Sequence, residues 1–557
     1  MRTAKSRSVE SAVPRSPSTT VWHLLGGILE QFALRVESAL LRAPWLGIVG
    51  VSCVFLLCAS LKARRLPFTF DEILTEYVAA LPSFDAIWKT LAAHAESSPP
   101  LFHLISKLSG HALGWNGLGL RFPAVVGYLL MMICVYFMVR RYVGLLYAAI
   151  AVFASFLTYA PFYATEARPY GLLLGLSALA ALCWQAVTQY RARWIALVGL
   201  FVSLGLAFNL QYFAVLTLAA IALGELVRDW RLRRIDWAVW AALVLATTPL
   251  LFLRPLMWSN WVLKQGYFAP ATVSQFVGGI VELYLPLGGI LCAAFVVLVL
   301  ACILSLGRPT VPKMSAVGPP VHELAAWVAL LLAPIAAFIA GRLVLGVYVS
   351  RYSLVTVIGF SLLLPFCLQR LFQGSRAAAL GTLAFLIFCF AARYGIPSKI
   401  ENPSTGLLPW VKRANALQLP IVVADPGTYL QFVHSGSGEL RDALVYIPDP
   451  KEALRYTGAN STDYNLAGLR STGRLRLPEY SDFKRSHERF LVLWEISPFD
   501  WIMPRLREDG AQMRLCSAPG YRILVVAEFV ASTEGSASGR KVDQVCDTGV
   551  SISGVER

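Results

Sequence analysis

Charged residues are scarce in this chain. They make up 15% of its 557 residues, whereas the hydrophobic set AVILMFWYC makes up 57%, and the mean hydropathy is +0.59. Soluble domains carry about 25% charged and about 45–50% apolar residues. The composition therefore excludes a single soluble globule, a disordered chain and a fibrous protein. It predicts a mostly α-helical, polytopic membrane protein with a soluble part.

Motifs for metal and nucleotide binding are also missing. None of the ten cysteines stands in a CxxC or in a Cys/His metal spacing, and the chain has no P-loop and no convincing dinucleotide-binding glycine motif. Most of the cysteines lie in apolar runs, as small core residues do. Only Cys516 and Cys546 fall in polar sequence, where they could pair if that part of the chain lies in an oxidising compartment.

Acidic residues are outnumbered, with 33 Asp and Glu against 49 Lys and Arg and a net charge of +16. In a soluble protein this excess of basic residues would suggest binding to nucleic acid. In a membrane protein the basic loops face anionic lipid and fix the topology. Membrane lipids, and not nucleic acid, are therefore the expected partners of the basic residues.

About eleven apolar runs have the length of a membrane span, which takes roughly 17–25 residues. Residues 1–44 precede them as a disordered Ser/Arg/Pro-rich start and an interfacial helix. The transmembrane domain is expected over 45–394. Its runs are 45–62, 121–139, 143–162, 170–188, 194–210, 212–227, 237–254, 278–304, 323–346, 353–369 and 376–394.

Basic residues alternate between the loops that join these runs. One side holds the basic clusters Arg140/Arg141, Arg191/Arg193, Arg228/Arg231/Arg233/Arg234, Arg308/Lys313 and Arg370/Arg376. The short loops on the other side hold few basic residues. The basic side is expected to be cytoplasmic, with the N-terminus, in a bacterial inner membrane. The basic cluster from Lys62 to Arg65 lies on the side assigned as outside and disagrees with this topology. The assignment follows the larger number of basic loops on the other side.

The sequence changes character after the last run. Strand-like runs at 421–424, 443–447, 490–494 and 521–526 alternate with helical patterns and turn sequences. Residues 395–530 are therefore expected to form a small α/β domain outside the cytoplasm. The Ser/Gly-rich tail 531–557 is expected to be disordered.

The long first outer loop, 63–120, carries the most informative residues. Five acids lie between positions 71 and 96 against a single base, and Asp71 and Glu72 are adjacent just beyond the first span. Such a pair can act as a general base or hold a divalent cation, although no ligand spacing fixes a metal. Equally, Asp71 could simply cap an interfacial helix that begins at Glu72.

Further charged residues reach the same membrane face. The stretch from Tyr163 to Tyr170 contains Glu166 and Arg168, and the guanidinium can offer a planar fork of donors to phosphate oxygens. These groups could instead pair with each other or snorkel to the interface. The candidate substrate-binding residues gathered on this face are Glu166, Arg168, Tyr170, His103, Arg121, Lys264, Arg351 and Tyr352.

Five motifs follow one another along the chain, namely Asp71-Glu72, Pro99-Pro100, Arg121-Phe122-Pro123, Glu166-Ala167-Arg168-Pro169-Tyr170 and Arg351-Tyr352. In this order they resemble the GT-C membrane glycosyltransferases, and most of all the bacterial relatives of protein O-mannosyltransferase and aminoarabinose transferase. The resemblance covers about 45–395 and is strongest over 66–190. It implies a polyprenyl-phosphate sugar donor and transfer on the outer face. No cofactor is expected to be required, although a divalent cation is possible.

Carried over to this sequence, the resemblance makes Asp71 the catalytic carboxylate, with Glu72 as its acidic neighbour and Arg168 near the donor phosphate. Relatives often show His-Pro-Pro, whereas this chain has Ser98-Pro99-Pro100 with His103 three residues later. This departure leaves the role of His103 open.

The expected mechanism is an inverting transfer. Asp71 removes the proton of an acceptor hydroxyl, and Arg168, with Arg351 or Lys264, stabilises the leaving phosphate. The acceptor could be a lipid, a glycan or a protein. A transporter or flippase is the first alternative, but it usually has repeated halves and broken spans, which the sequence does not show. A non-catalytic scaffold is the second, and the intact acidic motifs argue against it.

The alternating basic loops predict the topology, and a fusion tests it. A reporter joined after residue 530 should be active only if it works outside the cytoplasm. Activity of a reporter that works only in the cytoplasm would show that the assignment is inverted.

Overall fold

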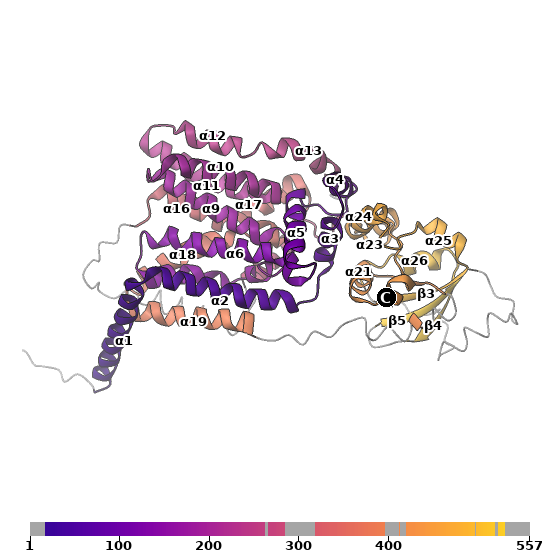
Figure 1. Ribbon diagram of the computed structural model, residues 1–557, viewed down its shortest axis with the longest axis horizontal. Helices are drawn as coiled ribbons and strands as arrows, with labels where there is room; N and C mark the ends of the chain where they lie inside the picture. The colour runs from indigo at the N-terminus through magenta and orange to yellow at the C-terminus, as the bar shows by residue number, and fades with distance from the viewer. Residues whose placement is uncertain are drawn as a thin grey trace, which may run out of the picture.

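A helical bundle and an α/β domain make up the molecule (Figure 1). The computed structural model describes residues 17–261, 266–284, 318–395, 411–412, 419–495, 497–517 and 522–529. The bundle helices are α1 (Pro17–Arg42), α2 (Pro44–Arg65), α6 (Gly117–Arg140), α7 (Leu145–Ala154), α8 (Ala160–Tyr163), α9 (Tyr170–Thr188), α10 (Arg193–Leu210), α11 (Val215–Leu232), α12 (Trp237–Leu245), α13 (Pro249–Ser259), α14 (Val273–Tyr284), α16 (Val321–Leu331), α17 (Ala333–Ala340), α18 (Thr356–Leu371) and α19 (Arg376–Gly395).

The expected apolar runs fall on these helices. Within the described residues, six helices are long and apolar enough to cross a membrane, or seven if the pair Val321–Leu331 and Ala333–Leu345, bent by 54°, counts as one span. Leu145–Leu157 and Thr356–Leu371 are shorter apolar helices. Most of the run 278–304 lies outside the described residues. The chain is a multi-pass membrane protein, and the count of eleven spans stays a prediction.

Helix α1 covers the segment expected to form an interfacial helix and is tilted away from the bundle axis (Figure 1), while its interfacial position stays a prediction. Two of its carboxylates hold it to the bundle. Glu30 accepts from the backbone N–H groups of Arg376 and Ala377, and Glu37 accepts from the Arg376 side chain at 2.7 Å. These contacts satisfy the free N–H groups at the start of α19.

The long loop after α2 folds into three helices, α3 (Phe70–Ala79), α4 (Phe84–Ala92) and α5 (Pro100–Leu113). They lie across the end of the bundle that faces the α/β domain (Figure 1). Sequence features mark their starts, because Ser83 caps α4 through the N–H of Ala86 and α5 begins at Pro100.

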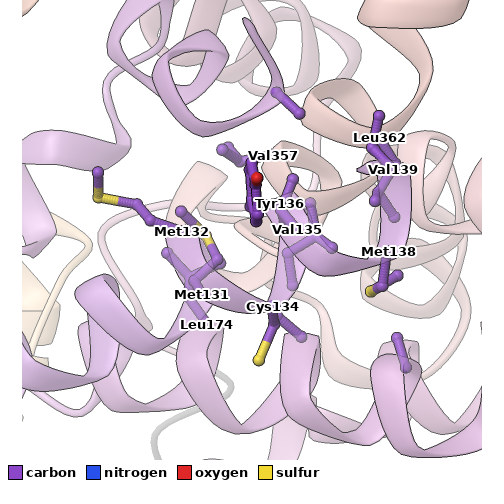
Figure 2. Packing of buried hydrophobic residues seen from close by; sticks show 14 of the residues in the cluster. Met131, Met132, Cys134, Val135, Tyr136, Met138, Val139, Leu174, Val357 and Leu362 are labelled. Carbon is purple, nitrogen blue, oxygen red and sulfur yellow. The ribbon is translucent and has the colours of Figure 1, made fainter. Parts of the chain in front are cut away.

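The core of the bundle forms around α6, α9 and α18. Figure 2 shows apolar side chains of α6 packed with Leu174 of α9 and with Val357 and Leu362 of α18. The residues of α6 in this view are Met131, Met132, Cys134, Val135, Tyr136, Met138 and Val139. Such a buried, apolar α6 is expected for a helix surrounded by others.

Glycines bring α6 and α9 close together. A methyl group on Gly127 would lie 2.4 Å from the Cα of Leu172, and one on Gly175 would lie 2.3 Å from the carbonyl oxygen of Gly127. Small residues permit this approach in membranes, where backbone packing replaces the hydrophobic drive between helices. The approach also fixes the start of α9, which begins two residues after Arg168.

The α/β domain contains one five-stranded sheet in the order β2-β1-β3-β5-β4. Strands β2, β1 and β3 are parallel, and β5 and β4 continue the sheet antiparallel to β3 and to each other. The elements are β1 (Ile421–Val423), α21 (Pro426–Ser435), α22 (Gly438–Ala443), β2 (Leu444–Val445), α23 (Pro450–Thr457), α24 (Ser461–Leu469), α25 (Tyr480–Ser486), β3 (Arg489–Glu495), α26 (Ile502–Glu508), β4 (Gln512–Ser517) and β5 (Arg522–Glu528). The four expected strands are present, and β4 is an additional strand. Cys546 lies outside the described residues, so its pairing with Cys516 stays a prediction.

The loop helices and the α/β domain share one apolar core. Val78 and Ile87 of the loop helices belong to the same buried cluster as Val422 and Tyr429 of the domain. Across this contact the ring of His434 lies 2.7 Å from Glu76. The domain is therefore packed directly on the loop that carries Asp71.

The close approach of α6 and α9 predicts the effect of a single methyl group. Gly127→Ala should destabilise the protein by about 1–3 kcal/mol through overpacking, despite the gain in helix propensity. Gly381→Ala is the matched control, since nothing lies within 4 Å of a methyl group there. Thermal unfolding in detergent measures both, and equal stabilities would contradict the close approach.

Candidate active site

A cavity of about 500 Å³ lies between the bundle, the loop helices and the α/β domain. The charged groups that line it from the membrane side are Asp71, Glu96, Glu166, Arg168, Glu282 and Arg351. Aromatic side chains add apolar walls, namely Phe70, Tyr159, Phe162, Tyr163, Tyr267, Phe268 and Phe499. The α/β domain closes the far side with Asp425, Pro426, Gly427, Ser461, Thr462 and Asn465.

Beneath the cavity Arg121 and Glu72 form a buried, bidentate ion pair. The guanidinium donates through Nε and Nη2 to the two carboxylate oxygens at 2.6 and 2.7 Å, and both side chains are 1% exposed. Arg121 donates further to the carbonyls of Ala63, Leu66 and Pro67. Every N–H of the guanidinium is thereby used, which a buried charge requires.

Glu72 also accepts two backbone N–H groups, from Thr69 at 2.9 Å and from Ala167 at 2.6 Å. The first contact belongs to the start of α3, whose N-cap is Thr69 and whose first residue is Phe70. The alternative that Asp71 caps a helix beginning at Glu72 is therefore wrong, because the helix starts earlier and Thr69 holds the cap position.

Asp71 lies between two arginines at the cavity. Its Oδ2 accepts from Nη1 of Arg351 at 2.9 Å and lies 3.8 Å from Nη2 of Arg168. Its side chain is 26% exposed, more than those of Glu72 and Glu96. Burial opposes ionisation, but the charges of Arg168 and Arg351 outweigh it and hold the pKa of this carboxyl below its usual value. Asp71 is therefore ionised at neutral pH.

A second carboxylate fixes Arg168. Glu96 accepts from its Nη1 at 2.6 Å, and the Thr75 hydroxyl donates to the other oxygen of Glu96 at 3.1 Å. His103 is fully buried, with Nε2 3.6 Å from Glu96, and no hydrogen bond partner for its ring nitrogens lies among the described residues. Burial lowers the pKa of His103 although Glu96 opposes the shift, so the ring is neutral.

Glu166 lines the same cavity as Asp71 and Arg168, and it forms no ion pair in the described part of the chain. It is 6% exposed, and its Oε2 is buried without a hydrogen bond partner there. Burial raises the pKa of Glu166 to about 8, because the pull of Arg168 is opposed by Glu72 and Asp71. This carboxyl is mostly protonated at neutral pH.

Two expected tyrosines flank the arginines. Tyr170 at the start of α9 is buried, with the Arg168 guanidinium 6.0 Å from its ring centre. Tyr352 stacks on Phe213 at 4.0 Å and shares a hydrogen bond of 3.1 Å with Tyr267. Lys264 lies outside the described residues, so its place at the site stays a prediction.

The structure thus brings together Asp71, Glu166, Arg168 and Arg351, which sequence positions alone do not join. Sequence reasoning missed the specific role of Glu96, which was one acid among five in the loop. It also gave the α/β domain no role, although Asp425 and Gly427 follow β1 directly and face the cavity. The sequence did hold a signal for this role, because ligands often bind beyond the carboxyl end of a parallel strand, where Asp425 and Gly427 lie.

A resident metal has no ready ligand set in the described part of the chain. No group of three or more His, Cys, Asp or Glu side chains there could hold an ion. Three of the site's carboxylates, Asp71, Glu72 and Glu96, already bind arginines. The divalent cation considered from the sequence stays a prediction.

Comparisons with known proteins agree with this architecture. The family model described as dolichyl-phosphate-mannose-protein mannosyltransferase matches residues 97–258. Apo ArnT from Cupriavidus metallidurans superposes with a TM-score of 0.50 at 12% identity, over 87% of this chain and 98% of that chain. ArnT bound to undecaprenyl phosphate gives 0.49 at 13% identity, over 87% and 99%.

The apo oligosaccharyltransferase of Archaeoglobus fulgidus gives a TM-score of 0.39 at 12% identity, over 81% of this chain and 70% of that chain. No curated protein matches the sequence. The likeness to apo ArnT confirms the fold class that the sequence resemblance implied.

The buried pair of Arg121 and Glu72 predicts a large loss of stability. Arg121→Gln should cost about 3–5 kcal/mol, because it leaves a buried carboxylate without its counter-ion. The control is Lys89→Gln in the same loop, where an exposed pair with Asp85 contributes about 0.5 kcal/mol or less. Thermal unfolding compares them, and similar melting temperatures would contradict a structural role for Arg121.

Proposed function

We propose that this chain, a membrane glycosyltransferase of the GT-C fold related to O-mannosyltransferases and ArnT, transfers a sugar from a polyprenyl-phosphate donor to an acceptor hydroxyl in the cavity. The class of enzyme rests on the family match and on the shared fold. The donor class is supported by the site's own cations and by the undecaprenyl phosphate bound to ArnT in one of the similar structures.

One observation carries the proposal, namely an ionised carboxylate between two guanidiniums at an internal cavity. Nε of Arg168 and Nε of Arg351 are both buried without a hydrogen bond partner among the described residues. They are therefore donors with unused capacity beside Asp71. A phosphate group is the ligand that such planar donors bind best.

The proposed mechanism begins when the donor phosphate binds Arg351 and Arg168. Sharing their charge with the phosphate weakens their hold on Asp71, which raises the proton affinity of its carboxylate. Asp71 then takes the proton of the acceptor hydroxyl as the oxygen attacks the anomeric carbon. The bond from that carbon to the phosphate oxygen breaks, and both electrons leave with the polyprenyl phosphate.

The leaving phosphate gains negative charge during this step. Arg168 and Arg351, whose side chains are 5% and 19% exposed, stabilise that charge, because partly buried fixed charges act more strongly than charges in water. A single direct displacement inverts the anomeric configuration. The contacts of Glu72 favour a positioning role, since both its oxygens are occupied by Arg121 and by backbone N–H groups.

The proposed setting is the outer face of a bacterial plasma membrane. Lateral diffusion in the bilayer brings the lipid-linked donor to the cavity, so no nucleotide-sugar site is needed. The acceptor enters between the bundle and the α/β domain, where Asp425 and Asn465 line the cavity. Lipids, glycans and proteins all offer a suitable hydroxyl group.

Asp71→Asn tests the mechanism, because it keeps the shape of the side chain but removes the proton acceptor. Transfer from a radiolabelled polyprenyl-phosphate sugar to candidate acceptors should fall by about 10²–10⁴-fold per folded molecule. The control is Asp85→Asn, an exposed acid of the same loop that lies outside the cavity lining. Its turnover should match that of the wild type. Normal turnover in Asp71→Asn would exclude Asp71 as the general base.

A further inference from the structure

Glu166 is a carboxyl group of the cavity that has no cation of its own in the described residues. We infer that Glu166 carries a proton in the resting enzyme and donates a hydrogen bond from its carboxyl O–H to the phosphate of the lipid-linked donor. The inference rests on the proposed function and deepens it, since it adds a neutral donor to the two arginines that bind the phosphate.

Counting the charges at the site leads to this assignment. Arg121 pairs with Glu72, Arg168 pairs with Glu96, and Arg351 pairs with Asp71. Three guanidiniums therefore balance three carboxylates. An ionised Glu166 would add a buried negative charge without a counter-ion among the described residues, and proteins avoid this by keeping such a group neutral.

The described groups around Glu166 do not include an unpaired positive charge that could act as its counter-ion. Burial and the charges of Glu72 and Asp71 disfavour a further carboxylate, whereas Arg168 and Arg351 favour one and are already paired. The titratable and charged groups that face it are Asp71 and Glu72 from α3, Tyr159 and Tyr163 beside α8, Arg168 from its own segment, Glu282 from α14 and Arg351 from the turn before α18. The net result is the pKa of about 8 given above.

Position then selects the ligand. Glu166 lines the cavity together with Arg168 and Arg351, and its Oε2 has no protein partner among the described residues. An ionised carboxylate at this place would repel a phosphate. A protonated one donates to it, as a neutral acid in an apolar site can.

The experiment measures the affinity of the purified full-length protein, in lipid nanodiscs, for undecaprenyl phosphate between about pH 6 and about pH 9.5. Because the protonated form binds, the wild-type Kd should increase as the pH rises through about 8, by up to ~10-fold per pH unit. Glu166→Gln is neutral and keeps an N–H donor at every pH. Its Kd should vary only with the titration of the probe itself.

Two further variants complete the comparison. Glu166→Ala removes the donor and should bind more weakly than Glu166→Gln at neutral pH. Asp85→Asn alters an exposed acid outside the cavity lining and should keep the wild-type pH dependence. Infrared difference spectra, wild type minus Glu166→Gln, supply an independent readout, since they should contain the carbonyl band of one protonated carboxyl at neutral pH and lose it at high pH.

Each outcome has a distinct meaning. If wild type and Glu166→Gln share one pH dependence, or the infrared difference spectrum between them lacks the carbonyl band, the inference is wrong while the proposed function stands. If Mg²⁺ strengthens binding to the wild type but not to Glu166→Gln, Glu166 is a cation ligand and the inference is again wrong. If undecaprenyl phosphate binds the wild type at no pH, the proposed donor class itself fails.

Discussion

The buried ion pair of Arg121 and Glu72 is the interaction on which the rest of the site depends. It joins the end of α2, the start of α3, the start of α6 and the backbone at Ala167 through one guanidinium and one carboxylate. Because Asp71 precedes Glu72 and Arg168 follows Ala167, fixing these two neighbours also fixes the groups that face the cavity. The pair thereby positions Asp71, the proposed general base, and Arg168, the proposed phosphate ligand.

Charge balance is the second constraint. Burying charged groups at a membrane boundary is costly, and the structure offsets this cost by pairing Glu96 with Arg168 and Asp71 with Arg351. The pairing nevertheless leaves Nε of Arg168 and Nε of Arg351 without a hydrogen bond partner among the described residues. A bound anion can therefore be accommodated by sharing existing cations, with little rearrangement.

The α/β domain adds the outer wall of the site. Its helices α21 and α24 contact α3 and α4 and share an apolar core with them, and Asp425 in the turn after β1 lines the cavity beside the acidic loop. Asn465 donates to the carbonyls of His94 and Ala95 and fixes α24 against the same loop. The cavity is thus formed by segments more than three hundred residues apart in the chain.

The sequence by itself determined the membrane class, the order of the apolar helices and four of the five strands, because apolar periodicity and turn residues are local signals. It also located Asp71 and Arg168, whose charges stand out beside apolar runs. Tertiary structure alone decided which carboxylate pairs with which arginine. Glu72 and Asp71 are adjacent and alike in sequence, yet one is buried against Arg121 and the other faces the cavity, since successive helix positions point about 100° apart. Glu96 and Asp425 gained their places only through long-range packing, which no local pattern records.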